Sequence, residues 1–411
     1  MKKFLSLILF CLLVLTVGCS KTQPGQVQDV LALRQVVAQD NATSRTIMWQ
    51  SSKPHEQPQV EYRLAGQAAT KTINATEDIF TDDKVKKHIF TAHLQKLQPS
   101  QKYEYRVGYG KERGQWETLT TAGAANFKAL IFPDSQSSDY SGWKKLAASA
   151  WQNNNDASFF INMGDLVDNG ESEHQWNEWF AGISPFSAKI PLAPVMGNHE
   201  AYTLDWKMRL SLAYVHYFQL PVNNASKFQN QYYSFDYGDV HFAVLNTQMQ
   251  ETVEFQPDML DTQIAWLKQD MTQSTKKWKV VLMHKDVLQY SFATRKTPRP
   301  EGISEEGKIF MPLFDELGVD AVLSAHLHTY RRRGHIKNFL RDPKGPEYIL
   351  TGVSGNVVYP NLWKQHGLDE YVAPQPETTN YIVLEVSDKG LGFTCFLPSG
   401  EKLDTVLVSK P

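Results

Sequence analysis

Residues 157–170 read Ala157-Ser-Phe-Phe-Ile-Asn-Met163-Gly-Asp165-Leu-Val-Asp168-Asn-Gly170, an apolar run that ends abruptly in acidic residues and glycines. An apolar run without alternation is typical of a strand that is covered on both faces. In open α/β sheets, ligands bind just beyond the carboxyl ends of such strands. The pattern therefore predicts a buried strand that brings Asp165 to a binding site.

The same pattern occurs at four other places in the second part of the chain. Short apolar runs at 127–132, 191–196, 280–283 and 321–323 also end on polar residues. They lead into Pro133-Asp134-Ser-Gln136, Gly197-Asn198-His199-Glu200, His284 and Ala325-His326-Leu-His328, respectively. Because the carboxyl ends of parallel strands meet at one edge of a sheet, these side chains are expected to share one crevice.

Helical and hairpin patterns lie between these runs. Helices are predicted at 143–151 and 261–271, and an antiparallel hairpin at 232–246 around Gly238-Asp239. Strand patterns return near the end of the chain, including 381–386 and 392–396. Residues 123–411 are therefore predicted to form an α/β (α+β) domain that ends in strands.

Residues 29–122 have a different pattern, made of short β-rich runs with turn residues between them. The segment Leu97-Gln-Pro99-Ser-Gln-Lys-Tyr103 places a leucine and a proline before a tyrosine at a strand start. That arrangement is typical of a tyrosine corner, in which the tyrosine hydroxyl bonds to upstream backbone in a β-sandwich. We predict an all-β domain here, similar to a fibronectin type III sandwich.

The first 19 residues differ in kind from the rest. A lysine-containing start and an apolar run from Phe4 to Val17 lead into Gly18-Cys19, which predicts a secretory signal. The end of this run resembles a bacterial lipoprotein signal, in which Cys19 is acylated, although Leu15 stands one place earlier than usual. We expect a protein that is exported to the periplasm or cell surface and anchored to the membrane by lipid. The alternative is an ordinary cleaved signal.

Composition narrows the remaining possibilities. Residues 20–28 are polar and are predicted to be a tether. The chain has 3 cysteines, and loss of Cys11 with the leader and acylation of Cys19 would leave Cys395 without a disulfide partner. A formal net charge of −2 gives no footprint for nucleic acid. The sequence does not define the oligomeric state.

The residues after the apolar runs suit a site for two divalent metal ions. Oxygen and nitrogen ligands without thiolate favour iron, manganese or zinc. A carboxylate between two cations can hold them roughly 3.5–4 Å apart, which stabilises the attacking and the leaving oxygens at phosphorus. A single Gly-Asp pair or histidine after a strand is more often structural. The repetition of the pattern favours function.

The order of these blocks resembles the calcineurin-like metallophosphoesterase superfamily and, within it, the purple acid phosphatases with their fibronectin type III-like amino-terminal domain. The likeness extends through Ala325-His326-Leu-His328-Thr-Tyr330-Arg331. It implies a metallophosphoesterase sandwich of two β-sheets flanked by helices. It also implies hydrolysis of phosphate esters, by an acid-phosphatase-like phosphomonoesterase acting on a phosphorylated small molecule or phosphoprotein.

The resemblance also assigns roles to individual residues. Asp134 and His328 would bind the first metal, Asp165 would bridge as a catalytic ligand, and Asn198, His284 and His326 would bind the second metal. Asn198 and His199 would contact the substrate phosphate, and His199 would also assist the departing oxygen. Arg331, which follows the last block, is a further candidate phosphate contact.

Two residues depart from the family pattern. Asp168 stands where purple acid phosphatases have the tyrosine that binds ferric iron, so we do not expect the purple colour. Gln136 stands where the wider superfamily has a histidine. The spacing favours Gln136 as a ligand of the first metal, with Asp168 or water as alternatives. Asp168 is otherwise expected to support a ligand from behind.

Two rival functions fit the same residues. A phosphodiesterase or nucleotide hydrolase would use the same blocks. A non-catalytic surface lipoprotein that binds a phosphorylated ligand would explain the unusual Gln136 and Asp168, but the pair Asn198-His199 argues against it.

Overall fold

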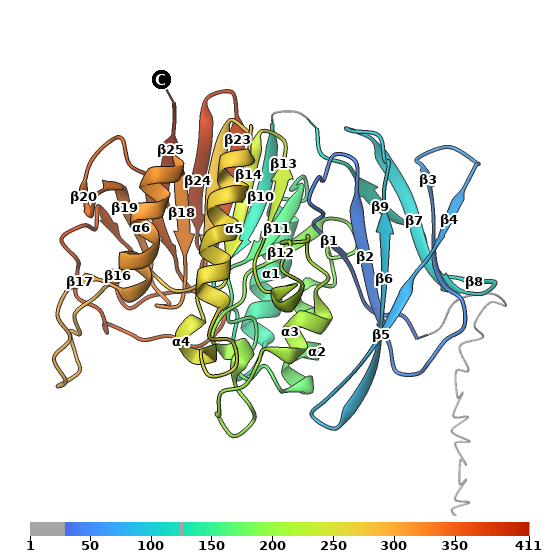
Figure 1. Cartoon of the computed structure of the whole chain (residues 1–411), viewed down its shortest axis with the longest axis horizontal. Coiled ribbons are helices and arrows are strands. Elements are labelled where there is room, and N and C mark those ends of the chain that lie inside the picture. The colour runs from blue at the N-terminus through green and yellow to red at the C-terminus, as the bar shows by residue number, and fades with distance from the viewer. Residues whose placement is uncertain (1–28, 124–125, 411) are drawn as a thin grey trace, which may run out of the picture.

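The computed structural model describes residues 29–123 and 126–410. The predicted signal with Cys19 and the tether at 20–28 lie outside the described residues. The chain has a β-rich amino-terminal part and a larger α/β part, which Figure 1 shows side by side. Within the described ranges, no helix combines the length and the apolar character needed to cross a membrane.

Two packed sheets form the amino-terminal part, as predicted. The first contains β1 (Leu31–Val36), β2 (Arg45–Ser51), β5 (Thr76–Asp82) and β6 (Val85–Leu94). The second contains β3 (Pro58–Leu64), β4 (Lys71–Asn74), β7 (Lys102–Tyr109), β8 (Glu112–Arg113) and β9 (Glu117–Thr120). Buried side chains such as Trp49 and Tyr105 fill the space between them. The Gln98 amide donates to the Tyr103 hydroxyl at 2.9 Å, which confirms the tyrosine corner.

The α/β part is a sandwich of two sheets. In the first, β10 (Phe127–Phe132), β11 (Phe159–Asn162) and β12 (Pro191–Pro194) are parallel, followed outward from β10 by the antiparallel β23 (Tyr381–Ser387), β24 (Gly390–Phe396) and β25 (Lys402–Val408). The second contains β13 (Tyr233–Tyr237), β14 (Val240–Leu245), β15 (Trp278–Met283), β18 (Ala321–Ser324), β21 (Glu347–Thr351), β19 (Tyr330–Lys337), β20 (Leu340–Arg341) and β22 (Tyr371–Val372). A small ribbon pairs β16 (Leu288–Gln289) with β17 (Gly302–Ile303). The predicted runs, hairpin and carboxyl-terminal strands are all present.

Helices cover the outer faces of the sandwich. They are α1 (Ser141–Asn153), α2 (Glu173–Ile183), α3 (Leu212–Tyr217), α4 (Met249–Thr252), α5 (Met259–Gln273) and α6 (Glu305–Leu317), with short 3₁₀ turns η1 (His199–Ala201) and η2 (Ser226–Phe228). The limits of α6 follow from its sequence. The Ser304 hydroxyl accepts from the Gly307 amide at its start, and Gly318 ends the helix with φ of 66°.

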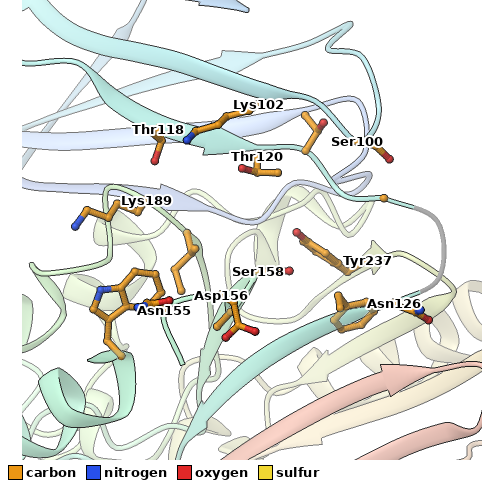
Figure 2. A pocket seen from close by; sticks show the side chains of 16 residues that line it. Ser100, Lys102, Thr118, Thr120, Asn126, Asn155, Asp156, Ser158, Lys189 and Tyr237 are labelled. Carbon is orange, nitrogen blue, oxygen red and sulfur yellow. The ribbon is translucent and has the colours of Figure 1, made fainter. Parts of the chain in front are cut away.

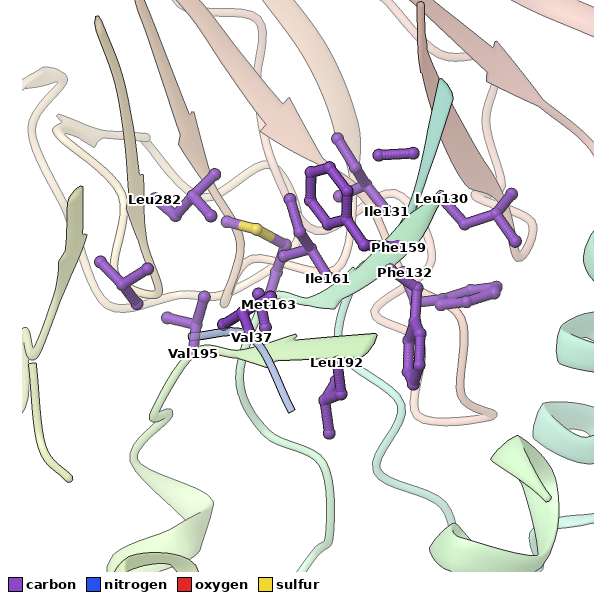
Figure 3. Packing of buried hydrophobic residues seen from close by; sticks show 14 of the residues in the cluster. Val37, Leu130, Ile131, Phe132, Phe159, Ile161, Met163, Leu192, Val195 and Leu282 are labelled. Carbon is purple, nitrogen blue, oxygen red and sulfur yellow. The ribbon is translucent and has the colours of Figure 1, made fainter. Parts of the chain in front are cut away.

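The main apolar core lies between the two sheets. Ile131 and Ile161 from the first sheet and Leu282 from the second belong to one buried cluster (Figure 3). On the outer side of the first sheet, Phe132 meets Trp143 of α1 edge to face. A second cluster joins α5 and α6 to the outer face of the second sheet. This packing explains the lack of alternation in the predicted strands, since both faces of each are covered.

One sheet runs continuously through both parts of the chain. Its order is β25-β24-β23-β10-β11-β12-β1-β2-β6-β5, so β1 joins the amino-terminal strands to β12. The pairing is parallel, with Gln35 opposite Pro191 and Val36 opposite Leu192. The Tyr105 hydroxyl also donates to the Ala188 carbonyl at 2.8 Å. The two parts therefore make a common structural unit in addition to their separate cores.

Candidate dimetal centre

The predicted ligands lie at the carboxyl ends of five strands in the two facing sheets. Asp134, Asp165 and Asn198 follow β10, β11 and β12, whereas His284 follows β15 and both His326 and His328 follow β18. Because the two sheets face each other across the core, the ends of their parallel strands converge at one edge of the sandwich.

The carboxylates and imidazoles form two overlapping groups. One contains Asp134, Asp165 and His328, and the other contains Asp165, His284 and His326. Within each group the three ligand atoms all lie within 4.8 Å of one another. Asp165 belongs to both groups, which is the position required of a carboxylate that bridges two cations. The structure thus brings together the two ligand sets that were predicted separately.

Asn198 lies beside the second group. The Nε2 atom of His284 is 3.2 Å from Asn198 Oδ1 and 3.1 Å from Asp165 Oδ2. All three side chains are buried. An amide oxygen, an imidazole nitrogen and a carboxylate oxygen therefore point at the same small volume.

Backbone carbonyls orient two of the histidines. The Nδ1–H group of His284 donates to the Met163 carbonyl at 2.9 Å, and that of His328 donates to the Val357 carbonyl at 2.5 Å. The Nε2 atom of His328 is left 3.1 Å from Asp134 Oδ2. A carbonyl that fixes one ring nitrogen as a donor leaves the other free to bind a metal.

Three candidate ligands have left-handed backbone conformations. Asp165, His326 and His328 have φ values of 47°, 73° and 52°. Such residues cost about 1–3 kcal/mol each and cluster at functional sites. Gly164, with φ of 97°, allows a similarly tight approach, because an added Cβ atom would lie 2.5 Å from His284 Nδ1. The side chains of these ligands are therefore oriented by strained backbone conformations.

Glu200 supports the bridging aspartate from behind, a role that the sequence reasoning missed. Its buried carboxylate accepts from the amides of Gly197 at 2.6 Å, Leu166 at 2.8 Å and Asp165 at 3.1 Å. It therefore ties the Asn198 loop to the Asp165 loop. The position of Glu200 in the Gly-Asn-His-Glu motif, directly after His199, is the one sequence feature from which this role could have been predicted.

The side chains present fit divalent metal ions. Gln136 Oε1 and His326 Nδ1 are buried and have no hydrogen-bond partner among the described residues. Burial alone would raise the pKa of Asp165, but His284 and His199 outweigh burial and lower it, so Asp165 is ionised. Buried carboxylate and imidazole ligands without a thiol suit iron, manganese or zinc.

Gln136 lies closer to the first ligand group than Asp168 does. Its side-chain amide is 3.4 Å from His328 Nε2, and the residue is fully buried. Asp168 belongs to neither ligand group, and its Oδ1 atom lies 3.4 Å from His199 Nδ1. Partial burial raises the pKa of Asp168, and Asp165 adds to this while His199 opposes it. The geometry favours Gln136 as ligand and Asp168 as support for His199.

His199 faces the two groups through its Nε2 atom. Its Nδ1–H group donates to the Asp168 carbonyl at 2.7 Å, and its Nε2 atom is 4.0 Å from Asp165 Oδ2. The His199 amide donates to Asp165 Oδ1 at 2.9 Å. The ring is thus fixed beside the bridging carboxylate with one nitrogen directed into the site.

Arg331 requires a correction, because its guanidinium is not available to a substrate. It is 1% exposed, its Nη1 atom pairs with Asp369 Oδ2 at 2.8 Å, and it also donates to the carbonyls of Trp363 and Lys364. The prediction failed because β19 begins at Tyr330, so that the side chains alternate from there and that of Arg331 enters a buried network.

Aromatic residues border the site on two sides and were not predicted. The ring centroid of Tyr359 is 4.9 Å from that of His328. Those of Tyr202 and Trp206 are 5.1 Å and 5.9 Å from that of His199, both in edge-to-face geometry. Only the position of Tyr202 and Trp206 shortly after the His199 motif could have drawn attention to them.

A separate cavity of about 540 Å³ lies between the two parts of the chain (Figure 2). Its lining includes Lys102, Lys189, Asp156 and Tyr237 and contains none of the candidate metal ligands. It is therefore distinct from the dimetal centre.

Comparison with protein families gives two matches that cover different parts of the chain. Residues 127–330 match the family described as calcineurin-like phosphoesterase, and residues 32–121 match the purple acid phosphatase N-terminal domain. The first range contains all of the candidate ligands, and the second covers the β-rich part.

Individual relatives agree with these matches. The chain is 31% identical to purple acid phosphatase 23 of Arabidopsis thaliana over 190 residues, which are 44% of this chain and 38% of that protein. It is 24% identical to acid phosphatase type 7 of Mus musculus over 341 residues, 75% and 74% of the two chains. The structure of purple acid phosphatase PPD1 from yellow lupin seeds has a TM-score of 0.72 at 17% identity, covering 93% of this chain and 74% of that one. The match to purple acid phosphatase 23 spans well under half of that relative's length.

Proposed function

Because the chain carries a calcineurin-like phosphoesterase domain behind a purple acid phosphatase N-terminal domain, we propose that it is a dimetal hydrolase of phosphate esters, with monoesters as its substrates. One observation carries the proposal. Asp165 is shared by two ligand groups, and His199 Nε2 stands 4.0 Å from that same carboxylate. A bridging ligand and a proton-carrying group therefore adjoin one reaction volume.

The chain supplies distinct functions around that volume. Two bound metal ions would polarise the phosphate and activate water for in-line attack. Asn198 and His199 are positioned to orient the phosphate from the side of the second group. The Nε2 atom of His199 is placed to hold a proton near the departing alcohol oxygen, and Asp168 fixes its ring through Nδ1. Glu200 keeps the Asp165 and Asn198 loops together.

Turnover of defined esters tests this proposal. Purified protein loaded with manganese, zinc or iron is expected to release phosphate from phenyl phosphate and to act more slowly on bis-phenyl phosphate. A faster diester reaction would instead assign a phosphodiesterase. Binding of phosphate without turnover under every metal would identify a non-catalytic binding protein and refute the proposal.

We also propose that the protein is exported and anchored by lipid at Cys19, on the sequence of its leader. Expressed at full length in bacteria, the protein should label with radioactive palmitate and sediment with membranes. The Cys19→Ser variant should lose the label and leave the membrane fraction or fail to mature. Labelling and sedimentation that persist in the variant would contradict the anchor.

A further inference from the structure

The wall of the site beside His199 is an aromatic hairpin that the proposed chemistry does not use. Residues 202–208 form this hairpin, whose stem is the bridge between Tyr202 and Met208. At its tip, the Thr203 amide donates to the Lys207 carbonyl at 2.9 Å, and the Trp206 amide donates to the Thr203 carbonyl at 3.0 Å. The hairpin therefore has a defined conformation.

The loop that carries Asp165 holds this hairpin in place. Asn169 donates to the Thr203 carbonyl at 2.9 Å, and the Leu204 amide donates to Glu171 Oε2 at 2.8 Å. Both anchoring residues follow Asp165 closely in the chain. The position of the hairpin is therefore linked directly to that of the bridging aspartate.

Trp206 is a large aromatic side chain that is exposed to solvent beside His199. Its side chain is 55% exposed, its φ is 60°, and its ring stands perpendicular to that of His199 at 5.9 Å. A tryptophan with a left-handed backbone is uncommon, and burial does not account for it. Its ring also lies 5.6 Å from that of Tyr202, so the two rings form a wall beside the histidine.

A groove lies next to the hairpin and shares Met208 with it. It has a volume of about 580 Å³ and is lined by Met208, Gln250, Glu251, Val253, Glu254 and Phe255. Val253 and Phe255 are exposed apolar side chains of its lining. The groove adjoins the centre, since Glu251 pairs at 2.6 Å with Lys285, the residue after the ligand His284. Tyr202 connects the two, because its ring centroid is 5.1 Å from that of His199 and its backbone pairs with Met208 of the groove lining.

The charges around the groove disfavour an anionic occupant. Glu251 and Glu254 line it, and the hairpin and its anchor carry two further carboxylates, Asp205 and Glu171, against one cation, Lys207. Lys285 is neutralised by its pairs with Glu251 and Glu306. A second phosphate or carboxylate on the substrate would be repelled here, whereas an uncharged flat ring would find aromatic and apolar partners.

We propose that Tyr202 and Trp206 bind the alcohol portion of the substrate and select phosphate monoesters whose leaving group carries an uncharged aromatic ring. This inference rests on the proposed phosphatase function and adds its substrate class. When the ester oxygen of the substrate lies next to His199, an aromatic ring attached close to that oxygen would lie against Trp206. A larger substituent on this ring would extend toward the groove. Trp206 is thus a specificity-determining residue.

Two matched esters test the inference. Benzyl phosphate and n-butyl phosphate have the same charge and alcohols of similar acidity, so the ratio of their kcat/KM values reports recognition of the ring. Trp206→Ala is expected to lower this ratio about tenfold, mainly through KM, because it removes an aromatic pair and its buried area. Trp206→Phe should keep most of the ratio. Leu340→Ala, at a distant residue that is 70% exposed, serves as the surface control.

Two results would overturn the inference. Equal losses of kcat/KM for both esters in Trp206→Ala, which leave the ratio unchanged, would mean that the ring only positions His199. Unchanged kcat/KM values for both esters would mean that the ring contacts no leaving group. Calorimetric binding of benzylphosphonate and n-butylphosphonate to the metal-loaded protein separates this question from turnover. Preferential, Trp206-dependent binding of benzylphosphonate without hydrolysis of either ester would refute the phosphatase and support the ring site. Hydrolysis without any ring preference would do the reverse.

Discussion

The replacement of Gln136 by alanine should remove one metal ion and leave the other. Gln136 is the neutral ligand proposed for the first metal, beside Asp134, Asp165 and His328. The second metal keeps Asn198, His284 and His326, and alanine retains the backbone amide through which Gln136 donates to the Asp165 carbonyl. We therefore expect a selective loss rather than collapse of the centre.

The size of the effect follows from what the Gln136 side chain contacts. Its amide nitrogen is 3.4 Å from His328 Nε2, too long for a strong hydrogen bond, and its Oε1 atom has no partner among the described residues. Removing an unsatisfied buried oxygen gains about 1–3 kcal/mol. The cavity that remains costs a similar amount, about 1–3 kcal/mol. The metal-free protein should therefore unfold at nearly the same temperature as the wild type.

Metal affinity should change far more than stability. Even groups that only support a ligand change metal affinity about 10–100-fold, so the loss of a direct ligand should weaken the first site by at least about 1.4–2.8 kcal/mol. Gln136→His should tighten the site, since imidazole is the stronger ligand. Asp168→Ala should keep both metals and lower the rate modestly, because it removes the carboxylate 3.4 Å from His199 Nδ1 but keeps the backbone carbonyl that holds the ring.

The assay is metal content per chain after dialysis against buffered manganese, with the metal-free melting temperature measured in parallel. We expect roughly one ion fewer in Gln136→Ala and partial recovery of its rate in excess manganese. Loss of an ion from Asp168→Ala but not from Gln136→Ala would contradict the assignment of Gln136 as a ligand. Asp168 would then be the ligand in place of the family's tyrosine.

Four further predictions test other parts of the structure. His199→Gln should lower kcat about 10²–10⁴-fold while metal content stays constant; a parallel loss of metal would make His199 a ligand rather than a proton carrier. Burial lowers the pKa of His241, but hydrogen bonds to two aspartates outweigh it and raise the pKa to about 9. The charged form should therefore add about 3 kcal/mol to the free energy of unfolding. This contribution is complete below the unfolded pKa of 6.5 and is lost as pH rises through 9. The melting temperature should therefore change less between about pH 6 and pH 10 in His241→Gln than in the wild type. Gly197→Ala would place a Cβ atom 2.2 Å from the Asp165 amide and carboxylate, and we expect loss of both metals and of more than about 99% of activity; normal metal content would show that the loop can relax. Arg331→Met should lower the free energy of unfolding by less than the roughly 3–5 kcal/mol of a fully unpaired buried charge, because Arg333 and the Tyr290 hydroxyl still contact Asp369, with KM nearly unchanged; a large rise in KM at normal stability would restore Arg331 as a phosphate contact.

The strands that carry the ligands could be predicted because burial on both faces requires short runs of apolar residues without alternation. β10 matches its predicted run at both ends, Phe127 and Phe132, since a strand covered on both faces is mainly apolar, and its one charged residue, Lys128, lies at the half-buried start. The ligands were predictable for a related reason. Polar side chains that follow several such runs at their carboxyl ends are not readily explained by one structural role.

What could not be predicted depends on long-range geometry. The strained backbone of His326 and His328 leaves little signal in residue type, because histidine still has a negative φ at most of its positions. Arg331 follows these ligands in the chain. The alternation of side chains along β19 nevertheless directs its guanidinium to Asp369 in a buried network. The position of Trp206 against His199 depends on a hairpin whose anchors lie in another loop.

The pairing of β1 with β12 has a consequence for how this protein can be shortened. Deleting the amino-terminal part would leave β12 with unpaired amides and carbonyls along one side, in the sheet that carries Asp134, Asp165 and Asn198. Because β12 has only four residues, with Pro191 and Pro194 at its ends, it offers other strands few free amides. The catalytic part produced alone should therefore lose stability at this edge more than it gains new strand pairing. A usable minimal fragment would have to keep β1 or cover that edge in another way.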